Sequence, residues 1–502
     1  MKSHTYTYDF AMVFCPRWDI ARPWTAPVYL LEAVRAHGFS AQFLDYNVRL
    51  YGDNFTPELW IDNVQHQFWK TQPLDYMLDQ IDLSEIDAAV VGFSLTDTNL
   101  PFSVELARRI RKSDPNKIII FGGHRVFFEE EPDAQVPLDA CDAIVKGEGE
   151  LTLLDILQNG LNKNIGTYTP EGDHWVFNGD RELITDLDQF PWPRYEDVDW
   201  NLYPMREMNI VGSRGCIFRC AFCNDIIRAR HRFRKRSPAH IAEEMLYNKA
   251  KNNVRFTCFN DSLVNADYRH LDELCDILLK RNFDRPWAAN FSVRGNMPEE
   301  LIRKAKRAGL SIVVLGLESG SPNVLKLMKK GCTVEEEEWF VNALHDAGIR
   351  MDITLIVGFP GETEQNFEET LAFLTKIAPK VWQVTSVATL NLDHSYIWDH
   401  LNEYGIVKLE KDRHISWYTK DGLNTYDVRL KRAERLVNHA RSLGLTHYLY
   451  DVAIEKKDQL LTMDVVRRNR RIAHTKHRIK NVLRGAHLLR PAQRVAAVLR
   501  RG

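Results

Sequence analysis

Three cysteines stand close together in the middle of the chain. Cys216, Cys220 and Cys223 are separated by three and two residues, and they follow the glycine-bearing segment 212–215. On a loop, this spacing lets three thiolates converge on one metal cluster, and a [4Fe–4S] cube is normally held by four thiolates. Three protein ligands leave one iron open to bind a small molecule through amine and carboxylate groups. The alternatives are three buried structural cysteines, or a zinc site without its fourth ligand, for which His231 is the nearest candidate.

Further residues suited to binding a ligand follow the cysteines at the ends of predicted strands. They are Asn260, Asp261, Arg294, Glu318, Gly358 and Pro360, and the hydrophobic Phe222 directly precedes the third cysteine. Each position alone is also compatible with a plain structural role. The turn at Gly358 is equally a strand-to-helix connection capped by Thr363, and Glu318 is equally a charge at the start of a helix.

The region 206–390 must position these residues. Strands are predicted at 208–211, 254–259, 287–291, 311–315, 351–357 and 382–388, and helices between them at 238–249, 267–280, 298–308, 335–347 and 363–377. The first helix begins with Ser237 as a side-chain cap and Pro238 at its first position. Six β/α units in a row predict a partial (β/α)6 barrel of the TIM type, whose chemistry collects on loops at the carboxyl ends of the strands.

The first 150 residues predict a separate α/β domain. Strand-like runs at 10–14, 40–44, 88–93, 117–121 and 143–145 alternate with helical segments, which favours a doubly wound, Rossmann-like parallel sheet. Ligands on such sheets lie outside the carboxyl ends of the strands. Those ends carry Ser94, Thr96, Gly122, Gly123, Gly147, Glu148 and Gly149. Residues 151–205 read as a proline-punctuated linker with a hairpin, and 391–502 as an α-helical C-terminal region.

Taken in order, the cysteine triplet and the later strand-end motifs resemble the radical S-adenosylmethionine (SAM) superfamily. The resemblance implies that the three cysteines hold a [4Fe–4S] cluster and that SAM chelates its open iron. It also implies that the backbone at Phe222 contacts the adenine, that polar groups at Asn260 and Asp261 hold the methionine amine, and that Arg294 pairs with the carboxylate. Glu318 and the turn of Gly358 and Pro360 would complete the ribose or amine contacts and the adenine contacts. Reductive cleavage of SAM then yields a 5′-deoxyadenosyl radical, which abstracts a substrate hydrogen.

An α/β domain before such a barrel resembles the cobalamin (B12)-binding branch of that superfamily. The resemblance implies that the loop with Ser94 and Thr96 and the pair Gly122 and Gly123 cradle the nucleotide tail of the corrin, where small residues let the backbone approach closely. The segment from Gly147 to Gly149 belongs to the same pattern. The chain has no Asp-x-His-x-x-Gly segment, which supplies the lower cobalt ligand in other cobalamin proteins. The domain therefore binds cobalamin without a histidine ligand, or it is an empty scaffold.

Composition limits the remaining possibilities. The 502 residues include 66 basic and 68 acidic side chains, which predicts no nucleic-acid partner, and no signal peptide or membrane-spanning run is found, so a reducing cytoplasm is expected. Eight cysteines are too few for a disulfide scaffold. The segment 464–502 carries twelve Lys and Arg against one acidic residue, at amphipathic helical spacing. This basic tail packs on the acidic body of the chain, or it contacts a membrane surface or an acidic partner.

These observations favour a cobalamin-dependent radical SAM methyltransferase acting on an unactivated carbon of a small-molecule or peptide substrate, with an external electron donor of the flavodoxin or ferredoxin type. The alternative is a radical SAM dehydratase, epimerase, oxidase or cyclase, in which the first domain is vestigial or uses cobalamin for another purpose. A third interpretation, an electron carrier, leaves the strand-end motifs without a use.

Overall fold

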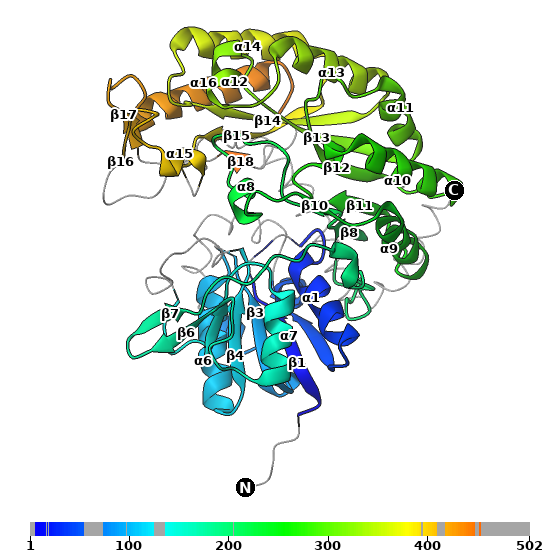
Figure 1. Ribbon diagram of the computed structural model, residues 1–502, viewed down its shortest axis with the longest axis vertical. Coiled ribbons are helices and arrows are strands. Elements are labelled where there is room, and N and C mark those ends of the chain that lie inside the picture. The colour runs from blue at the N-terminus through cyan, green and yellow to red at the C-terminus, as the bar shows by residue number, and fades with distance from the viewer. Residues whose placement is uncertain are drawn as a thin grey trace, which may run out of the picture.

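The chain is described by a computed structural model, which covers residues 6–16, 18, 20–54, 74–96, 98–124, 136–203, 205–392, 395–408, 417–446 and 451–452. Two lobes, each built on one large sheet, make up the molecule (Figure 1). The basic tail at 464–502 lies outside the described residues, so its predicted helices stay predictions. No helix in the described ranges is long and apolar enough to cross a membrane.

The first lobe contains a seven-stranded sheet with the order β2-β1-β3-β4-β5-β6-β7. Five strands run parallel: β1 (Tyr8–Phe14), β2 (Ala41–Asp45), β3 (Ala88–Ser94), β4 (Ile118–Gly122) and β5 (Ala143–Val145). The order reverses between β1 and β3, and the carboxyl edge at such a switch point is where doubly wound sheets bind ligands. The predicted strands all form, within one or two residues of their expected bounds.

Alternate residues of β1 enter two different hydrophobic cores. Phe10 and Met12 belong to the core that includes α1 (Thr25–Ala36) and α7 (Glu150–Asn159). Ala11 and Val13 belong to the core that includes α6 (Leu100–Ser113), α5 (Leu74–Leu78) and the start of α2 (Tyr46–Asn54). Because side chains alternate across a strand, a segment buried on both faces is expected to be apolar at every position, as residues 10–14 are.

The hairpin predicted within the linker extends this first sheet. Its strands, β6 (Thr167–Glu171) and β7 (His174–Phe177), are antiparallel, and β6 pairs with β5. Residues 151–177 are therefore structurally part of the first lobe, and the extended connection to the second lobe begins after them.

The second lobe is a half-barrel of parallel strands in the order β8-β11-β12-β13-β14-β15-β18. Their bounds are β8 (Glu207–Ile210), β11 (Phe256–Phe259), β12 (Trp287–Ser292), β13 (Leu310–Glu318), β14 (Arg350–Val357), β15 (Gln383–Thr389) and β18 (Asp451–Val452). The first six match the six predicted strands. The seventh comes from the region expected to be helical.

Helices cover the outer side of this sheet (Figure 1). They are α9 (Pro238–Lys251), α10 (Tyr268–Lys280), α11 (Glu299–Arg307), α12 (Pro322–Leu327), α13 (Val334–Asp346) and α14 (Glu364–Ile377). The first of them, α9, also contacts the first lobe, because the Tyr29 hydroxyl of α1 donates to Glu244 at 3.0 Å. Ser237 caps α9 as predicted, because its Oγ accepts a 3.2 Å hydrogen bond from the backbone N–H of His240. Thr363 caps α14 in a reciprocal capping box with Asn366.

The segment after β15 contains both helices and strands. It comprises α15 (Tyr396–Asp399), the antiparallel pair β16 (Ile406–Lys408) and β17 (Trp417–Thr419), the long α16 (Tyr426–Ser442) and β18. Leu436, Val437 and Ala440 of α16 are buried in the main core. The C-terminal region therefore completes the half-barrel.

Candidate active site

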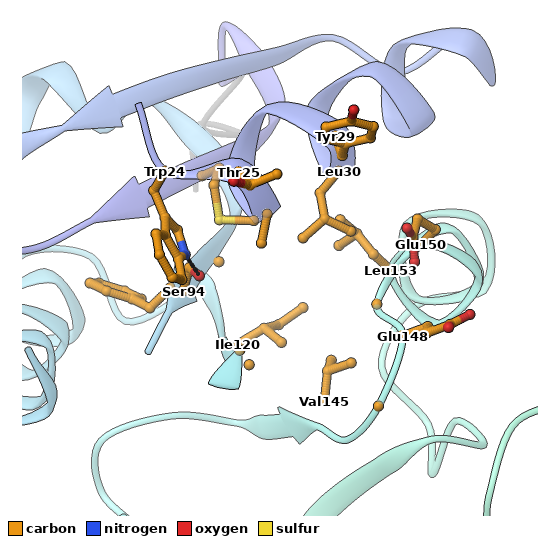
Figure 2. A pocket seen from close by; sticks show the side chains of 18 of the residues that line it. Trp24, Thr25, Tyr29, Leu30, Ser94, Ile120, Val145, Glu148, Glu150 and Leu153 are labelled. Atoms are coloured by element: carbon orange, nitrogen blue, oxygen red, sulfur yellow. Dashed lines mark hydrogen bonds between the residues drawn. The ribbon is translucent and has the colours of Figure 1, made fainter. Parts of the chain in front are cut away.

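A cavity of about 290 Å³ opens at the carboxyl edge of the first sheet, at the β1/β3 switch point (Figure 2). It is lined from the first lobe by Phe10, Met12, Trp24, Thr25, Ala26, Tyr29, Leu30, Gly92, Phe93, Ser94, Ile120, Phe121, Gly122, Gly123, Val145, Gly147, Glu148, Gly149, Glu150 and Leu153. Val211, Arg214 and Asn260 of the second lobe complete the wall. Six of the seven residues predicted for a corrin site therefore lie together.

Thr96 is the seventh predicted residue, and it does not line this cavity. Its backbone N–H donates a 2.7 Å hydrogen bond to Asn99 Oδ1, and its hydroxyl lies 3.3 Å from that of Thr98. Asn99 also donates to the Ser94 carbonyl at 3.0 Å. Thr96 thus belongs to the turn that holds the loop in place, and it does not face the cavity itself.

Trp24 forms one wall of the cavity and holds the predicted Ser94 in place. Its indole N–H donates a 3.1 Å hydrogen bond to Ser94 Oγ, shown as the dashed line in Figure 2. Its ring stacks on Phe14 at 5.7 Å between centroids and meets Trp18 edge-on at 4.7 Å. The wall is therefore flat, apolar and fixed, as an aromatic group entering the cavity requires.

Glycines form part of the cavity wall because side chains would not fit there. A Cβ on Gly92 would lie 2.8 Å from the ring of Phe10, and one on Gly123 would lie 2.8 Å from the backbone of Leu95. Gly123 also has φ +107°, a conformation that favours glycine. These glycines let the chain pack closely against Phe10 and Leu95, while the contact of this pair of loops with a corrin tail stays a prediction.

The cavity also presents one polar atom that the described protein does not satisfy. Thr25 Oγ1, at the start of α1, is buried without a hydrogen-bond partner among the described residues. Buried hydroxyls normally have a partner, so a ligand with a polar group fits this position. An apolar wall, a glycine-lined edge and a free hydroxyl suit a large, mainly apolar group with polar edges, such as the tail of a corrin.

The cysteine loop follows β8 at the mouth of the half-barrel. Cys216, Cys220 and Cys223 are free and partly buried. The loop is held from two other elements, because the Ala221 N–H donates to the Met328 carbonyl at 2.9 Å and the Ile397 N–H donates to the Ala221 carbonyl at 3.2 Å. The three thiols therefore lie on a fixed loop beside the ends of α12 and α15.

The thiols lie close enough to influence one another. Burial raises the pKa of Cys220, the neighbouring Cys216 raises it further, and Lys330 opposes the increase. Burial raises the pKa of Cys223 to about 12, with contributions from Asp225 and the other two thiols. No three His, Cys, Asp or Glu side chains in the described ranges converge around one ion. An iron–sulfur cube does not demand that convergence, since each thiolate binds a different iron.

Asp261 supports the loop before the cysteines. Its carboxylate accepts hydrogen bonds from the Gly212 N–H at 2.7 Å and from Ser213 Oγ at 2.6 Å. Burial raises the pKa of Asp261 to about 6, although these hydrogen bonds oppose the rise. Its neighbour Asn260 is exposed and lines the cavity of the first lobe. Of the predicted pair, Asp261 thus contacts protein and Asn260 faces the space between the lobes.

Arg294 is likewise engaged with the protein. Its guanidinium donates to the carbonyls of Asn265 at 3.2 Å and Ala266 at 2.5 Å, in the short 3-10 helix η6 (Val264–Ala266), and lies 4.3 Å above the Tyr268 ring. These contacts fix the guanidinium at the carboxyl end of β12.

Glu318 ends β13 in a strained conformation, with φ +70°. It is buried, Lys330 Nζ lies 3.6 Å from its Oε1, and Thr354 donates to it at 3.3 Å. Burial raises the pKa of Glu318, and Lys330 opposes the rise. Lys330 Nζ also lies 5.9 Å from the ring of the predicted Phe222. The sequence analysis did not single out Lys330, yet this buried cation pairs with Glu318 and acts on Cys220 of the cysteine loop.

The turn of Gly358 and Pro360 is buried against the C-terminal region. Asn424 Nδ2 donates to the Gly358 carbonyl at 2.9 Å, and a Cβ on Gly358 would overlap Arg429 at 2.2 Å. The Gly358 N–H donates to Glu362 at 2.7 Å. The sequence analysis did not predict Asn424 and Arg429 as part of this site. Asn424 lies 66 positions after Gly358, and no local sequence pattern links either residue to the turn.

Two family profiles match the chain in the order of the two lobes. The B12 binding domain matches residues 24–157, and the Radical SAM superfamily matches residues 210–374. A doubly wound domain with a glycine-lined cavity, followed by a half-barrel with a three-cysteine loop, defines a radical SAM protein with an N-terminal B12-binding domain. The chain therefore contains a B12 binding domain followed by a domain of the radical SAM superfamily.

Among curated relatives, an uncharacterized methyltransferase of Pyrococcus horikoshii is 27% identical over 304 residues, which cover 59% of this chain and 66% of that protein. An anaerobic magnesium-protoporphyrin IX monomethyl ester cyclase of Rubrivivax gelatinosus is 26% identical over 365 residues, covering 69% and 60%. The chain thus spans just under two thirds of the length of either relative.

Two solved structures share the fold of both lobes. The radical SAM methyltransferase TsrM of Kitasatospora setae, solved with cobalamin and a [4Fe–4S] cluster, has a TM-score of 0.63 at 17% identity and covers 90% of this chain and 92% of its own. OxsB, a cobalamin-dependent radical SAM enzyme solved with aqua-cobalamin and SAM, has a TM-score of 0.64 at 16% identity, covering 96% and 76%. At these identities the likeness establishes the arrangement of the lobes.

Proposed function

We propose that this protein is a cobalamin-dependent radical SAM methyltransferase, which transfers a methyl group to an unactivated carbon of a small-molecule or peptide substrate. One observation carries the proposal. The cavity of the first lobe is completed by Val211 and Asn260, which directly follow the first two strands of the half-barrel, and by Arg214, which precedes Cys216 by two residues. A ligand in the cavity therefore contacts the segment that leads into the cysteine loop, which supports transfer between two cofactors.

The cysteine loop would hold the cluster. Cys216, Cys220 and Cys223 would be the ligands of a [4Fe–4S] cluster, which, when bound, supplies the electron that cleaves SAM to a 5′-deoxyadenosyl radical. Lys330 places a buried positive charge beside Cys220 and offsets part of the negative charge of three thiolates. Phe222, Asn260, Arg294, Glu318, Gly358 and Pro360 would border SAM, and Asp261 would hold the loop in place.

The cavity of the first lobe would hold the cobalamin tail. When bound, cobalamin would carry the methyl group that is transferred. Trp24, supported from behind by the stacked Phe14, would contact an aromatic base, and the glycine edge would admit the chain that joins base and corrin. Thr25 Oγ1 would find there the hydrogen-bond partner that the protein does not give it.

A second candidate function is a radical SAM cyclase or another radical rearrangement, with cobalamin in a role other than methyl transfer. The observation that favours it is the similarity to the Rubrivivax gelatinosus cyclase, which is 26% identical to this chain, close to the 27% of the methyltransferase relative.

Product analysis separates the two functions. The protein is purified anaerobically, reconstituted with iron and sulfide with or without hydroxocobalamin, and incubated with reductant and SAM. Methyl transfer predicts S-adenosylhomocysteine that forms only when hydroxocobalamin is supplied, together with 5′-deoxyadenosine. Formation of 5′-deoxyadenosine alone supports the second function, and absence of both products refutes the two together.

The reaction also requires partners. We infer an external one-electron donor of the flavodoxin or ferredoxin type and a reducing compartment such as the cytoplasm, because an open iron is sensitive to oxidants. The basic tail at 464–502 is proposed to bind the acidic body of the chain, with an anionic membrane surface or acidic partner as the alternative.

A further inference from the structure

Glu148, which the sequence placed in the corrin cradle, turns its carboxylate away from the cavity (Figure 2). The carboxylate meets Arg234 at 2.6 Å and 3.0 Å in a two-pronged contact, and Arg214 at 3.1 Å. Burial alone would raise the pKa of Glu148, but the two arginines reverse this and lower it. The backbone around Glu148 thus faces the cavity, while its side chain binds the second lobe.

The two arginines face each other across a pair of short strands. β9 (Ser213–Arg214) and β10 (Arg234–Lys235) are antiparallel, and Arg214 lies opposite Arg234. Like charges directly opposite one another destabilise a strand pair. Glu148 lies between the two guanidinium groups, and Glu150 forms a further ion pair with Arg214. The charges of the two arginines are therefore balanced only when the loop that carries Glu148 and Glu150 is in place.

This strand pair leads directly into the cysteine loop. Gly215 has φ +86°, and a Cβ there would lie 2.6 Å from the Arg232 carbonyl, so the chain between Arg214 and Cys216 is tightly confined. A second contact between the lobes acts just upstream, where the Tyr29 hydroxyl of α1 accepts from the Val211 N–H at 2.9 Å. A shift of Arg214 therefore moves the first cysteine.

We propose that Glu148 is a positioning residue that orders the cysteine loop through Arg214 and Arg234, and that it thereby couples occupancy of the first-lobe cavity to assembly of the metal centre. The coupling half rests on the proposed function, since it needs a ligand in each site. The ordering half does not, because it follows from the ion pairs of the protein itself. Linkage requires the coupling to be reciprocal, so each ligand strengthens binding of the other.

The ordering half is tested by hydrogen exchange on the full chain without cofactors, comparing wild type with Glu148→Gln. The matched control is Asp197→Asn, which removes another carboxylate that joins the two parts of the chain through Arg35 but touches neither the cavity nor the cysteine loop. Removing one partner of a buried charge pair is strongly destabilising, so amides of 211–223 should exchange about tenfold faster in Glu148→Gln. Unchanged exchange in Glu148→Gln, or an equal increase in Asp197→Asn, overturns the proposal.

A second variant separates loss of position from loss of folding. Arg234→Gln combined with Glu148→Gln removes one charge of each sign, so Arg214 keeps Glu150 and no longer opposes a cation. The double variant should recover most of the wild-type exchange protection of 211–223. Arg234→Gln alone is measured as well. If the free-energy change of the double variant equals the sum of those of the two single variants, the charges do not act together and the proposed mechanism is overturned.

The coupling half is tested by measuring the dissociation constant of hydroxocobalamin before and after reconstitution with iron and sulfide. Wild type and Asp197→Asn should bind about tenfold more tightly after reconstitution, and Glu148→Gln should show no such gain. An equal gain in Glu148→Gln, or no gain in wild type, refutes the coupling. If wild type binds no hydroxocobalamin, the proposed function and the coupling fail together, while the exchange result still decides the positioning role.

Discussion

Replacing Gly123 with alanine should destabilise the first lobe more than the same change at Gly147, although both glycines line the cavity and both have positive φ. Gly123 has φ +107°, and its Cβ would lie 2.8 Å from both the backbone N and the backbone O of Leu95. Gly147 has φ +85°, and a Cβ there would meet nothing within 4 Å. The pair therefore separates the cost of the backbone conformation from the cost of the overlap.

The two contributions have different sizes. A side chain in the left-handed region costs about 1–2 kcal/mol, and this applies to both variants. Forcing an extra methyl group against packed atoms costs about 1–3 kcal/mol more, and this applies only to Gly123 because backbone atoms cannot rotate away. We expect the free energy of unfolding to fall by about 2–5 kcal/mol for Gly123→Ala and by about 1–2 kcal/mol for Gly147→Ala.

Thermal unfolding followed by circular dichroism, combined with urea titration, measures both effects. For a lobe of this size, each kcal/mol shifts the melting temperature by about 2–4 °C. Equal shifts for the two variants would refute the argument, because they would show that Leu95 relaxes without cost and that the Gly123 loop is not closely packed.

Three further outcomes are expected. Asp45 is buried, and burial raises its pKa from 3.8 to about 6, so between these pH values the folded state binds more protons than the unfolded state and the stability of the wild type falls as pH rises. The free energy of unfolding of Asp45→Asn should therefore increase by about 3 kcal/mol relative to wild type between pH 4 and 7. A difference between the two proteins that does not change with pH would contradict this. Cys216→Ala should lose iron on reconstitution and abolish 5′-deoxyadenosine, whereas Cys141→Ala, in the other lobe, should retain both; equal iron contents would argue against the cysteine loop. Tyr29→Phe removes a hydroxyl that bonds the second lobe and should lower the free energy of unfolding by about 1–3 kcal/mol, while the exposed Tyr76→Phe should have no measurable effect in the same urea titration.

The strands and their order of succession could be predicted because most buried parallel strands contain a run of apolar residues that is followed by glycine or polar residues. The run predicted at 117–121 is β4 (Ile118–Gly122), and the run at 351–357 is β14 (Arg350–Val357). The place of the hairpin was not predictable, because pairing of β6 with β5 depends on which edge of the sheet is free. The cysteine triplet could be predicted because its spacing is a local feature of the sequence and does not depend on long-range pairing.

The direction of individual side chains was beyond the reach of the sequence. Glu148 lies in a glycine-rich loop that suits a cradle, yet its carboxylate is drawn away by Arg234, which is 86 positions further along the chain. Asp261 follows a strand as a ligand-binding residue would, yet it bonds Gly212 and Ser213. In both residues, a long-range partner decides whether the side chain faces a ligand or the protein.

The half-barrel has two edges that do not meet. Among the described strands, β8 lies at one end of the sheet and β18 at the other, with no pairing between them. A closed barrel pairs its first and last strands, whereas here each of these two strands keeps backbone groups that no other described strand of the sheet pairs. In β8 the Asn209 carbonyl accepts a 2.8 Å hydrogen bond from the Tyr195 hydroxyl instead. The connection between the lobes therefore takes over part of the role that a neighbouring strand has in a closed barrel.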